Sequence, residues 1–112
     1  MKTSTKRKFP NKILKVSQVA KVLGHPARLA ILQKLAQKKE CICGDLVMDL
    51  PIAQATVSQH LKVLKDCGFI QGEIEGPKSK YCIDWKNFEQ YKKIIEQWLL
   101  SLSKQGKKMH VR

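Results

Sequence analysis

The apolar residues of this chain follow helical spacing over most of its length and strand-like alternation in one segment. Three- and four-residue spacings predict a helix from about Ile13 to Leu23, and Gly24 is a common residue at a helix end. Pro26 suits the first turn of a new helix, whose apolar face runs on to Leu35. The first third of the chain is therefore expected to form two helices joined by a short turn.

A second pair of helices, separated by three residues, is predicted for the middle of the chain. A short apolar pattern at residues 46–50 is followed by Pro51 to Ala53, and then by a stripe at spacings of four and three from Val57 to Leu64. The second of these helices is predicted to begin at Gln54 and to end at Gly68. Helix, short turn and helix is the helix-turn-helix geometry, in which the second helix enters the DNA major groove by its N-terminal end.

The first two turns of this second helix carry short or amide-bearing side chains that both donate and accept hydrogen bonds. Side chains of this kind read the edges of bases in a major groove. The candidate DNA-reading residues are Gln54, Thr56, Ser58 and Gln59. The competing interpretation is an ordinary amphipathic helix with a polar outer face.

Alternation with a period of two follows and predicts a β-hairpin. Its strands are expected at Ile70–Ile74 and Tyr81–Ile83, with a turn at residues 76–77. A hairpin directly behind a recognition helix is a wing, and Lys78 and Lys80 beside its tip are placed to reach phosphates or the adjacent minor groove. The alternative is a solvated turn with two lysines, because the same hairpin also carries two glutamates.

The last predicted helix, from about Trp85 to Ser103, has a wider apolar surface than one small domain needs. We expect a second subunit to bury part of it, because aromatic residues are typical interface anchors and twofold dimers are common. The expected dimer-interface residues are Phe88, Tyr91, Ile95, Trp98 and Leu102. The whole pattern predicts a mainly α fold with a β-hairpin wing, which is a dimeric winged helix-turn-helix.

The charge of the chain favours a nucleic-acid partner. Its 22 Lys and Arg residues outnumber 9 Asp and Glu, for a net charge of +13, and both ends are rich in basic residues. We expect a basic flexible N-terminal arm at residues 1–11, a winged helix-turn-helix DNA-binding and dimerisation domain at residues 12–103, and a basic flexible tail at residues 104–112. Such arms add affinity for phosphates without specifying a sequence, although many basic tails are simply solvated.

Length and composition narrow the class of protein. A chain of 112 residues has room for one domain with one core. No segment has the apolar length of a membrane span and the N-terminus lacks the apolar region of a secretion signal, so we expect a cytoplasmic protein without a membrane partner. No set of nucleophile, base and orienting group argues for an enzyme, and no obligatory cofactor is expected. In such a protein the four cysteines are expected to be thiols or metal ligands rather than disulfides.

The pattern Cys41-Ile42-Cys43 is the candidate for the chemistry of the chain. If this segment is extended, the side chains at positions i and i+2 point the same way, so that the two sulfur atoms converge on one ion. Two thiolates select soft, thiophilic ions. The competing interpretation is a pair of small apolar residues in a core, because free cysteine is among the most buried residue types.

Four segments carry a resemblance to a known family. They are LGHPARLAIL at Leu23–Leu32, ECICGDL at Glu40–Leu46, QATVSQHLKVLKDCGFI at Gln54–Ile70, and YCI at Tyr81–Ile83. Together these segments resemble the ArsR/SmtB winged-helix metalloregulators, and among them the arsenical-resistance repressors. The resemblance implies a homodimeric repressor that binds double-stranded operator DNA and leaves it when an effector binds.

The resemblance also assigns roles to individual residues of the predicted recognition helix. It adds His60 to the DNA-reading set and puts Lys62 near the DNA backbone. Because His60 lies three residues after Val57, it is equally suited to face inward as a structural histidine. His25 is expected to cap the helix that begins at Pro26, and Arg28 to pair with a carboxylate such as Asp45.

The Cys-x-Cys pattern looks like the family's site for trivalent arsenic and antimony, with other thiophilic metals as alternatives. Arsenical members often have another cysteine three residues after the second one, and this chain has Leu46 there. The lead and cadmium type draws cysteines from an N-terminal arm and the zinc type uses histidines in the last helix, and this chain has neither. As(III) or Sb(III) is therefore the expected effector, with Cys82 as a candidate third ligand and Cys67 as a packing residue.

Two other functions fit the same residues. One is a winged-helix DNA-binding protein that is independent of any effector or that responds to thiol oxidation. The other is a dimerisation module, since related winged helices precede catalytic domains in some methyltransferases.

Overall fold

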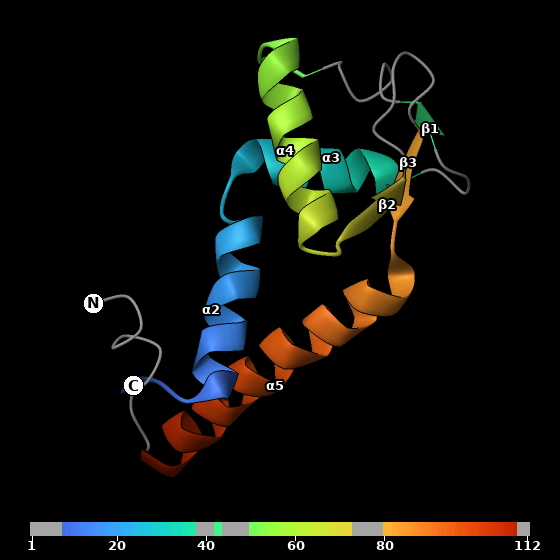
Figure 1. Ribbon diagram of the computed structural model, residues 1–112. Coiled ribbons are helices and arrows are strands. Elements are labelled where there is room, and N and C mark those ends of the chain that lie inside the picture. Colours follow the sequence, from blue (N-terminus) through green and yellow to red (C-terminus); the bar gives the residue numbers. More distant parts are fainter. Residues whose placement is uncertain (1–7, 38–41, 44–49, 73–79, 110–112) are drawn as a thin grey trace.

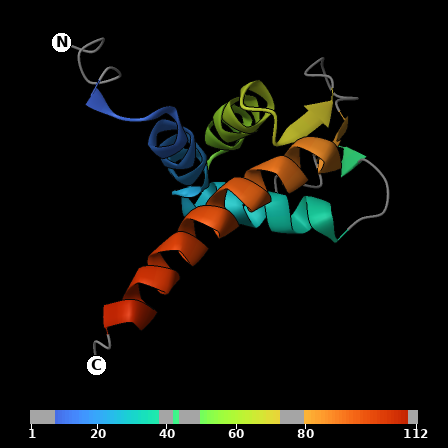
Figure 2. The ribbon, with the colours of Figure 1, turned by 90° about the horizontal axis from the view of Figure 1, so that it is seen from below.

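The structure is a computed structural model, which describes residues 8–37, 42–43, 50–72 and 80–109. Figure 1 shows a small sheet beside a crossed pair of helices, and two further helices that extend away from this body. The elements are α2 (Asn11–Leu23), α3 (Pro26–Ala36), β1 (Ile42–Cys43), α4 (Gln54–Asp66), β2 (Ile70–Gly72), β3 (Lys80–Ile83) and α5 (Trp85–Met109). Viewed from below, α5 crosses under the body and its C-terminal end projects beyond it (Figure 2).

The core lies where α3, α4 and the sheet meet. The predicted stripe of α4 supplies Val57, Leu61 and Leu64, which are at most 2% exposed, and Ile31 of α3 is fully buried against them. Burial of side chains of this size stabilises a fold by about 1.5 to 3 kcal/mol each, so this cluster contributes much of the favourable free energy of folding. The helix-turn-helix prediction for the Gln54 segment is confirmed in its second helix. The short helix expected at residues 46–50 lies almost wholly outside the described residues.

The end of α4 follows the Schellman arrangement expected for a glycine terminator. The Phe69 amide donates to the Leu64 carbonyl at 2.9 Å, and the Gly68 amide donates to the Lys65 carbonyl at 3.0 Å. Gly68 has a φ of 84°, a left-handed conformation that glycine adopts without steric cost. The turn points Phe69 back into the core, where its side chain is 2% exposed.

The sheet has three antiparallel strands in the order β1-β3-β2, so β3 pairs on both of its edges. Ile70 pairs with Ile83 and Gly72 with Tyr81, which confirms the predicted hairpin at the base of the wing. The tip of the wing, including Lys78, lies outside the described residues. The pairing of β1 with β3, which sets Ile42 opposite Tyr81, was not predicted from the sequence.

Helix α5 begins where the sequence predicted and ends later. The Asp84 side chain accepts a hydrogen bond from the Asn87 amide at 3.2 Å, which caps the first turn. The helix continues past Ser103 to Met109, so the part of the predicted flexible tail before residue 110 is helical. None of the described helices combines the length and apolarity needed to cross a membrane.

Candidate DNA-reading surface and cysteine site

The N-terminal half of α4 presents a polar surface to solvent. Gln54, Ser58 and Gln59 are exposed, and Thr56 is half-buried. The first turn carries no acidic residue, and Ala53 at the cap position provides no side-chain hydrogen bond. The positive end of the helix dipole is therefore free of side-chain capping, an arrangement that suits contact with a phosphate.

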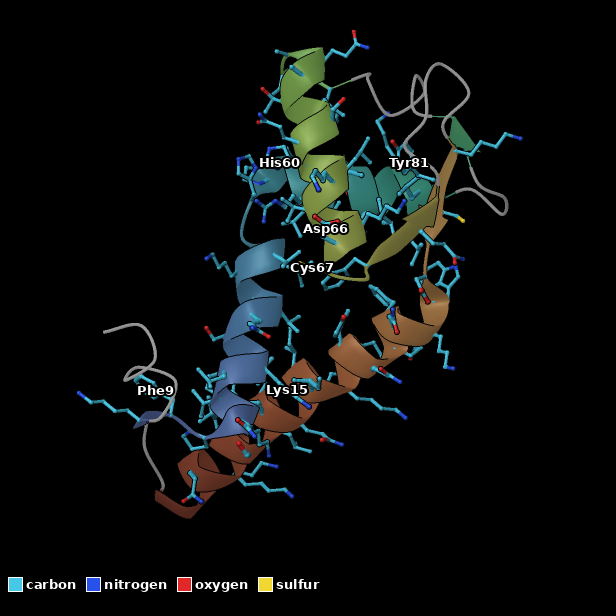
Figure 3. The ribbon with its side chains drawn as sticks, viewed as in Figure 1. Phe9, Lys15, His60, Asp66, Cys67 and Tyr81 are labelled. Atoms are coloured by element: carbon cyan, nitrogen blue, oxygen red, sulfur yellow. The ribbon has the colours of Figure 1, made fainter. Side chains whose placement is uncertain are left out.

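His60 belongs to the interior of the protein and not to this surface. It is 8% exposed and lies where α4 crosses α3 (Figure 3). Its Nδ1 accepts a hydrogen bond from Arg28 Nε at 3.2 Å, and its ring centroid lies 4.2 Å from that of His25. The inward interpretation of His60 is therefore the one that the structure supports, and His60 is removed from the DNA-reading set.

The surroundings of His60 disfavour the protonated form of its ring. Burial, followed by the nearby His25 and Arg28, lowers the pKa of His60 from its usual 6.5. Because Nδ1 accepts from Arg28, the ring proton lies on Nε2, a buried atom with no hydrogen-bond partner in the described part of the chain. A second proton on this ring would have to displace the Arg28 donor.

Arg28 joins three helices. From α3 it reaches His60 of α4, and its Nη1 donates to the carbonyls of Lys21 and Val22 at 3.4 and 3.1 Å, at the end of α2. The predicted partner Asp45 lies outside the described residues, so that pairing stays a prediction. The predicted cap of α3 is confirmed, because His25 Nδ1 accepts from the Ala27 amide at 3.1 Å.

The predicted backbone-contacting lysines differ in their surroundings. Lys62 is exposed and pairs with Asp66 one turn later, with Nζ and Oδ2 3.1 Å apart. An exposed pair of this kind is weak, so Lys62 remains available to a phosphate. Lys80 is exposed at the start of β3, and its backbone pairs with Cys43.

The cysteine pattern lies only partly within the described residues. Cys43 is described by its backbone in β1, and Cys41 lies outside. Cys82 is half-buried between the buried Tyr81 and Ile83, as the alternation predicted. It is disulfide-bonded, so the expectation that all four cysteines are thiols or metal ligands is wrong for Cys82. Its partner is not among the described side chains, and within them no group of three potential ligands could hold a metal ion. Cys67 is a free, half-buried thiol at the end of α4, which agrees with a packing role.

The apolar residues of α5 divide into two groups. Phe88, Tyr91 and Ile95 pack against the core of their own domain. The Tyr91 ring packs at a tilt against Phe69, with 4.7 Å between ring centroids, and the Tyr91 hydroxyl donates to the Cys67 carbonyl at 2.6 Å. Leu99 and Leu102 are each 51% exposed, and Trp98 is half-buried. Phe9 and Ile13, near the start of α2, are also exposed, and sequence reasoning missed them as surface residues.

Comparisons with known proteins identify relatives of this chain. The sequence profile described as bacterial regulatory protein, arsR family, matches residues 25–71. An uncharacterised HTH-type transcriptional regulator of Methanocaldococcus jannaschii is 31% identical over 74% of this chain and 93% of its own length. The arsenical resistance operon repressor of Staphylococcus xylosus is 30% identical over 81% of this chain and 85% of its own length. The transcriptional repressor SmtB of Mycobacterium tuberculosis H37Rv is 37% identical over 64% of this chain, which spans only 53% of that protein.

Solved structures confirm the winged helix-turn-helix fold. An ArsR-like transcriptional regulator from Rhodococcus sp. RHA1 has a TM-score of 0.67 at 17% identity, covering 89% of this chain and 93% of that one. The homodimeric winged helix-turn-helix DNA-binding domain Mb0332 from Mycobacterium bovis has a TM-score of 0.57 at 23% identity, covering 89% and 87% respectively.

Proposed function

Since this chain belongs to the ArsR family of bacterial regulatory proteins, we propose that it is a homodimeric repressor that leaves its operator when a soft ion binds its cysteines. The relatives are transcriptional regulators and not enzymes. The observation that carries the DNA-binding part of the proposal is the exposed polar face of α4, with an uncapped first turn, on a helix whose other face is fully buried.

In this proposal, sequence is read by the exposed residues of α4 and affinity comes from basic residues around them. Ser58 and Gln59 lie in the first two turns, the part of a recognition helix that contacts base edges. Lys62, Lys80 and the N-terminal arm at residues 1–11 would contact phosphates, which adds affinity and salt dependence without specificity.

The proposed dimer forms through the far end of α5 and the start of α2. Leu99 and Leu102 expose half of their surface, because they lie on the part of α5 that does not pack against the core of its own domain. Phe9 and Ile13 add exposed apolar surface at the N-terminal end of α2, and α2 contacts α5. In a twofold dimer joined here, the axis would relate the two α4 helices, and both would have to lie on the same face of the dimer to enter successive major grooves.

The proposed effector site combines Cys41 and Cys43 with Cys82. Support for Cys82 as the third ligand comes from the sheet. The strand β1 contains Cys43 and pairs with β3, which contains Cys82, so the Cys-x-Cys segment runs beside the strand of Cys82. The disulfide bond of Cys82 supports the same proximity, since a sulfur within bonding reach of another cysteine is also within reach of a shared ion. Three thiolates suit As(III) or Sb(III), and other thiophilic metals are alternatives.

Release would follow from the position of this site next to the helix-turn-helix. An ion held by Cys41 and Cys43 would distort the segment that follows them, which leads into the turn before α4. Leu50 and Ile52 of that turn pack against the core. A shift there would tilt α4 out of register with its partner, and a coupling of about 1 to 3 kcal/mol would weaken operator binding about 5- to 150-fold.

A specific observation also favours a thiol-redox response. Cys82 is disulfide-bonded in this structure, so an oxidised form of the protein would join β3 to another cysteine-bearing segment without any ion. The same cysteines would then report oxidation, and the reduced protein would be the form that binds DNA.

One gel-shift series tests both mechanisms. Reduced protein is titrated on its own upstream DNA with arsenite, antimonite, cadmium, lead and zinc, and separately with an oxidant. The Cys41→Ser and Cys43→Ser variants should keep their DNA affinity and lose release by arsenite, whereas Cys67→Ser is the matched control and should behave as the parent does. Release by arsenite in a protein lacking both Cys41 and Cys43 would refute the ion mechanism, and release by the oxidant alone would favour the redox one.

A further inference from the structure

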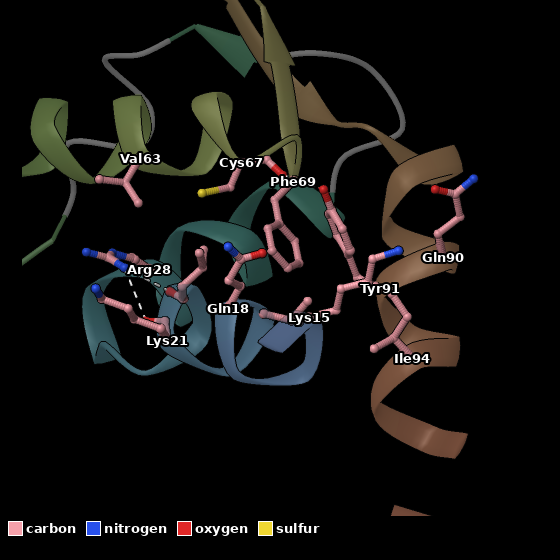
Figure 4. Close-up of a pocket in the computed structure, with 12 residues that line it drawn as sticks. Lys15, Gln18, Lys21, Arg28, Val63, Cys67, Phe69, Gln90, Tyr91 and Ile94 are labelled. Atoms are coloured by element: carbon pink, nitrogen blue, oxygen red, sulfur yellow. Dashed lines mark hydrogen bonds between the residues drawn. The ribbon is translucent and has the colours of Figure 1, made fainter. Parts of the chain in front are cut away.

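A cavity outside the cysteine site lies between α2, the C-terminal part of α4 and α5 (Figure 4). Its volume of about 620 Å³ falls within the range of sites that bind small molecules. The lining residues that determine its chemistry are Lys15, Gln18, Lys21, Arg28, Phe69 and Tyr91. Three of them are cationic and none is acidic, so the cavity complements a negative charge.

The two ends of the cavity differ in chemistry. Figure 4 shows Arg28 and Lys21 at one end, and Tyr91 and Ile94 at the other. The Tyr91 hydroxyl already donates to the Cys67 carbonyl, and its ring packs at a tilt against Phe69, so these two side chains offer mainly apolar surface. Figure 4 also shows the Lys15 side chain beside Tyr91 at this end. A ligand that matches both ends has an anionic group and an apolar body.

Arg28 has hydrogen-bonding capacity left for such an anionic group. A guanidinium carries five N–H donors. Nε donates to His60 and Nη1 donates to the two carbonyls at the end of α2, whereas Nη2 donates to no acceptor in the described part of the chain. A carboxylate fits this unused edge without displacing the bonds that Arg28 already makes.

We propose that this cavity binds a small amphipathic carboxylate, with the carboxylate at Arg28 and Lys21 and the apolar body against Phe69 and Tyr91. The site is independent of the cysteines and of any ion that they hold. Arg28 also binds His60 of the recognition helix, so occupancy of the cavity is expected to change operator affinity. This last link rests on the proposed DNA-binding function, whereas the binding site itself does not.

Direct binding to reduced, DNA-free protein tests the site. Decanoate, below its micelle concentration, and decanol are compared by calorimetric titration, because the two share a chain length and differ in charge. Decanoate should bind with 1:1 stoichiometry per chain, and decanol should bind at least about tenfold more weakly. Equal affinity for the two probes, or no binding of decanoate, would overturn the proposal.

Variants at exposed lining residues test the location without disturbing the core. Gln18→Trp fills the cavity and should abolish decanoate binding, whereas Gln33→Trp on the exposed face of α3 should have no effect. Lys21→Gln should weaken binding several-fold, and Lys86→Gln, which also removes a cation but lies outside the cavity, should not.

Two further measurements separate the possible failures. If no carboxylate binds and Gln18→Trp changes the monomer–dimer equilibrium in sedimentation, the cavity is part of the subunit interface and the proposal is wrong. If decanoate binds but leaves the gel shift unchanged, the site stands and the link through Arg28 is refuted. A change in operator affinity must be matched by an equal change in decanoate affinity when DNA is bound, because binding linkage is reciprocal.

Discussion

Replacement of Gly68 by alanine should destabilise the protein strongly, because this glycine ends α4 in a left-handed turn and its carbonyl accepts a hydrogen bond from Asn87 of α5. Its φ of 84° places it in the left-handed region, where an alanine costs about 1 to 2 kcal/mol. An added Cβ would also lie 2.9 Å from Asn87 Nδ2 and 3.1 Å from the Tyr91 hydroxyl. Asn87 must then move, although its Nδ2 donates to the Gly68 carbonyl at 3.2 Å, and loss of that bond adds about 0.5 to 1.5 kcal/mol.

The total expected loss is about 1.5 to 3.5 kcal/mol in the free energy of unfolding. Urea denaturation followed by circular dichroism, at one fixed protein concentration, should show a midpoint lowered by roughly 1 to 2 M. Gly106→Ala is the matched control, because Gly106 lies in α5 with nothing within 4 Å of an added Cβ. Alanine there should raise stability by up to about 1 kcal/mol. A Gly68→Ala protein as stable as the parent would refute the strained-turn argument, and a destabilised Gly106→Ala protein would refute the helical assignment beyond Ser103.

Three other outcomes are expected. Gln59→Ala should weaken operator binding by about 1 to 3 kcal/mol and binding to random DNA very little, as measured by gel shift on both DNAs; an equal loss on both would contradict base reading. Leu99→Glu with Leu102→Glu should give monomers in sedimentation, and a persistent dimer would move the interface elsewhere. Stability should fall as pH drops below about 6.5, because the unfolded chain then takes up a proton on His60 that the folded protein, with its lowered pKa, resists. A His60→Gln protein should show a flatter pH dependence in urea denaturation, and an unchanged slope would exclude His60 as the cause.

The sequence predicted those features that local chemistry determines. The apolar stripe from Val57 to Leu64 predicts which face of α4 is buried. A glycine after the last turn predicts that the helix ends there in a left-handed conformation. Both predictions are confirmed. The cap of α3 followed equally from a histidine directly before Pro26. Each of these features depends on residues within a few positions of one another.

Features that depend on distant partners were missed or left open. The strand β1 contains two described residues, too few for any alternation, and it forms by pairing with the edge of β3 that β2 does not occupy. The position of His60 in the helix was compatible with a buried and with an exposed side chain. Its burial depends on Arg28, which lies on another helix and donates a hydrogen bond to the His60 ring. The apolar stripe of α5 includes residues that pack against their own domain and residues that are exposed, and the sequence does not separate the two groups. Tyr91 was therefore assigned to a partner subunit, although it packs against Phe69 of its own domain. The basic residues at the C-terminal end suggested a flexible tail, but a solvated helix tolerates them and α5 runs to Met109.

The strand β3 holds Cys82, the third residue of the proposed effector site, and it also contributes two side chains to the core. Tyr81 and Ile83 point into the core, and Cys82 between them points to the other face. A slip of the strand by a single residue would exchange these faces, exposing two core residues and burying the cysteine among them. The chain therefore has little freedom to reposition this thiol through small changes of register. Cys82 keeps its place beside β1 for as long as the core keeps Tyr81 and Ile83 buried.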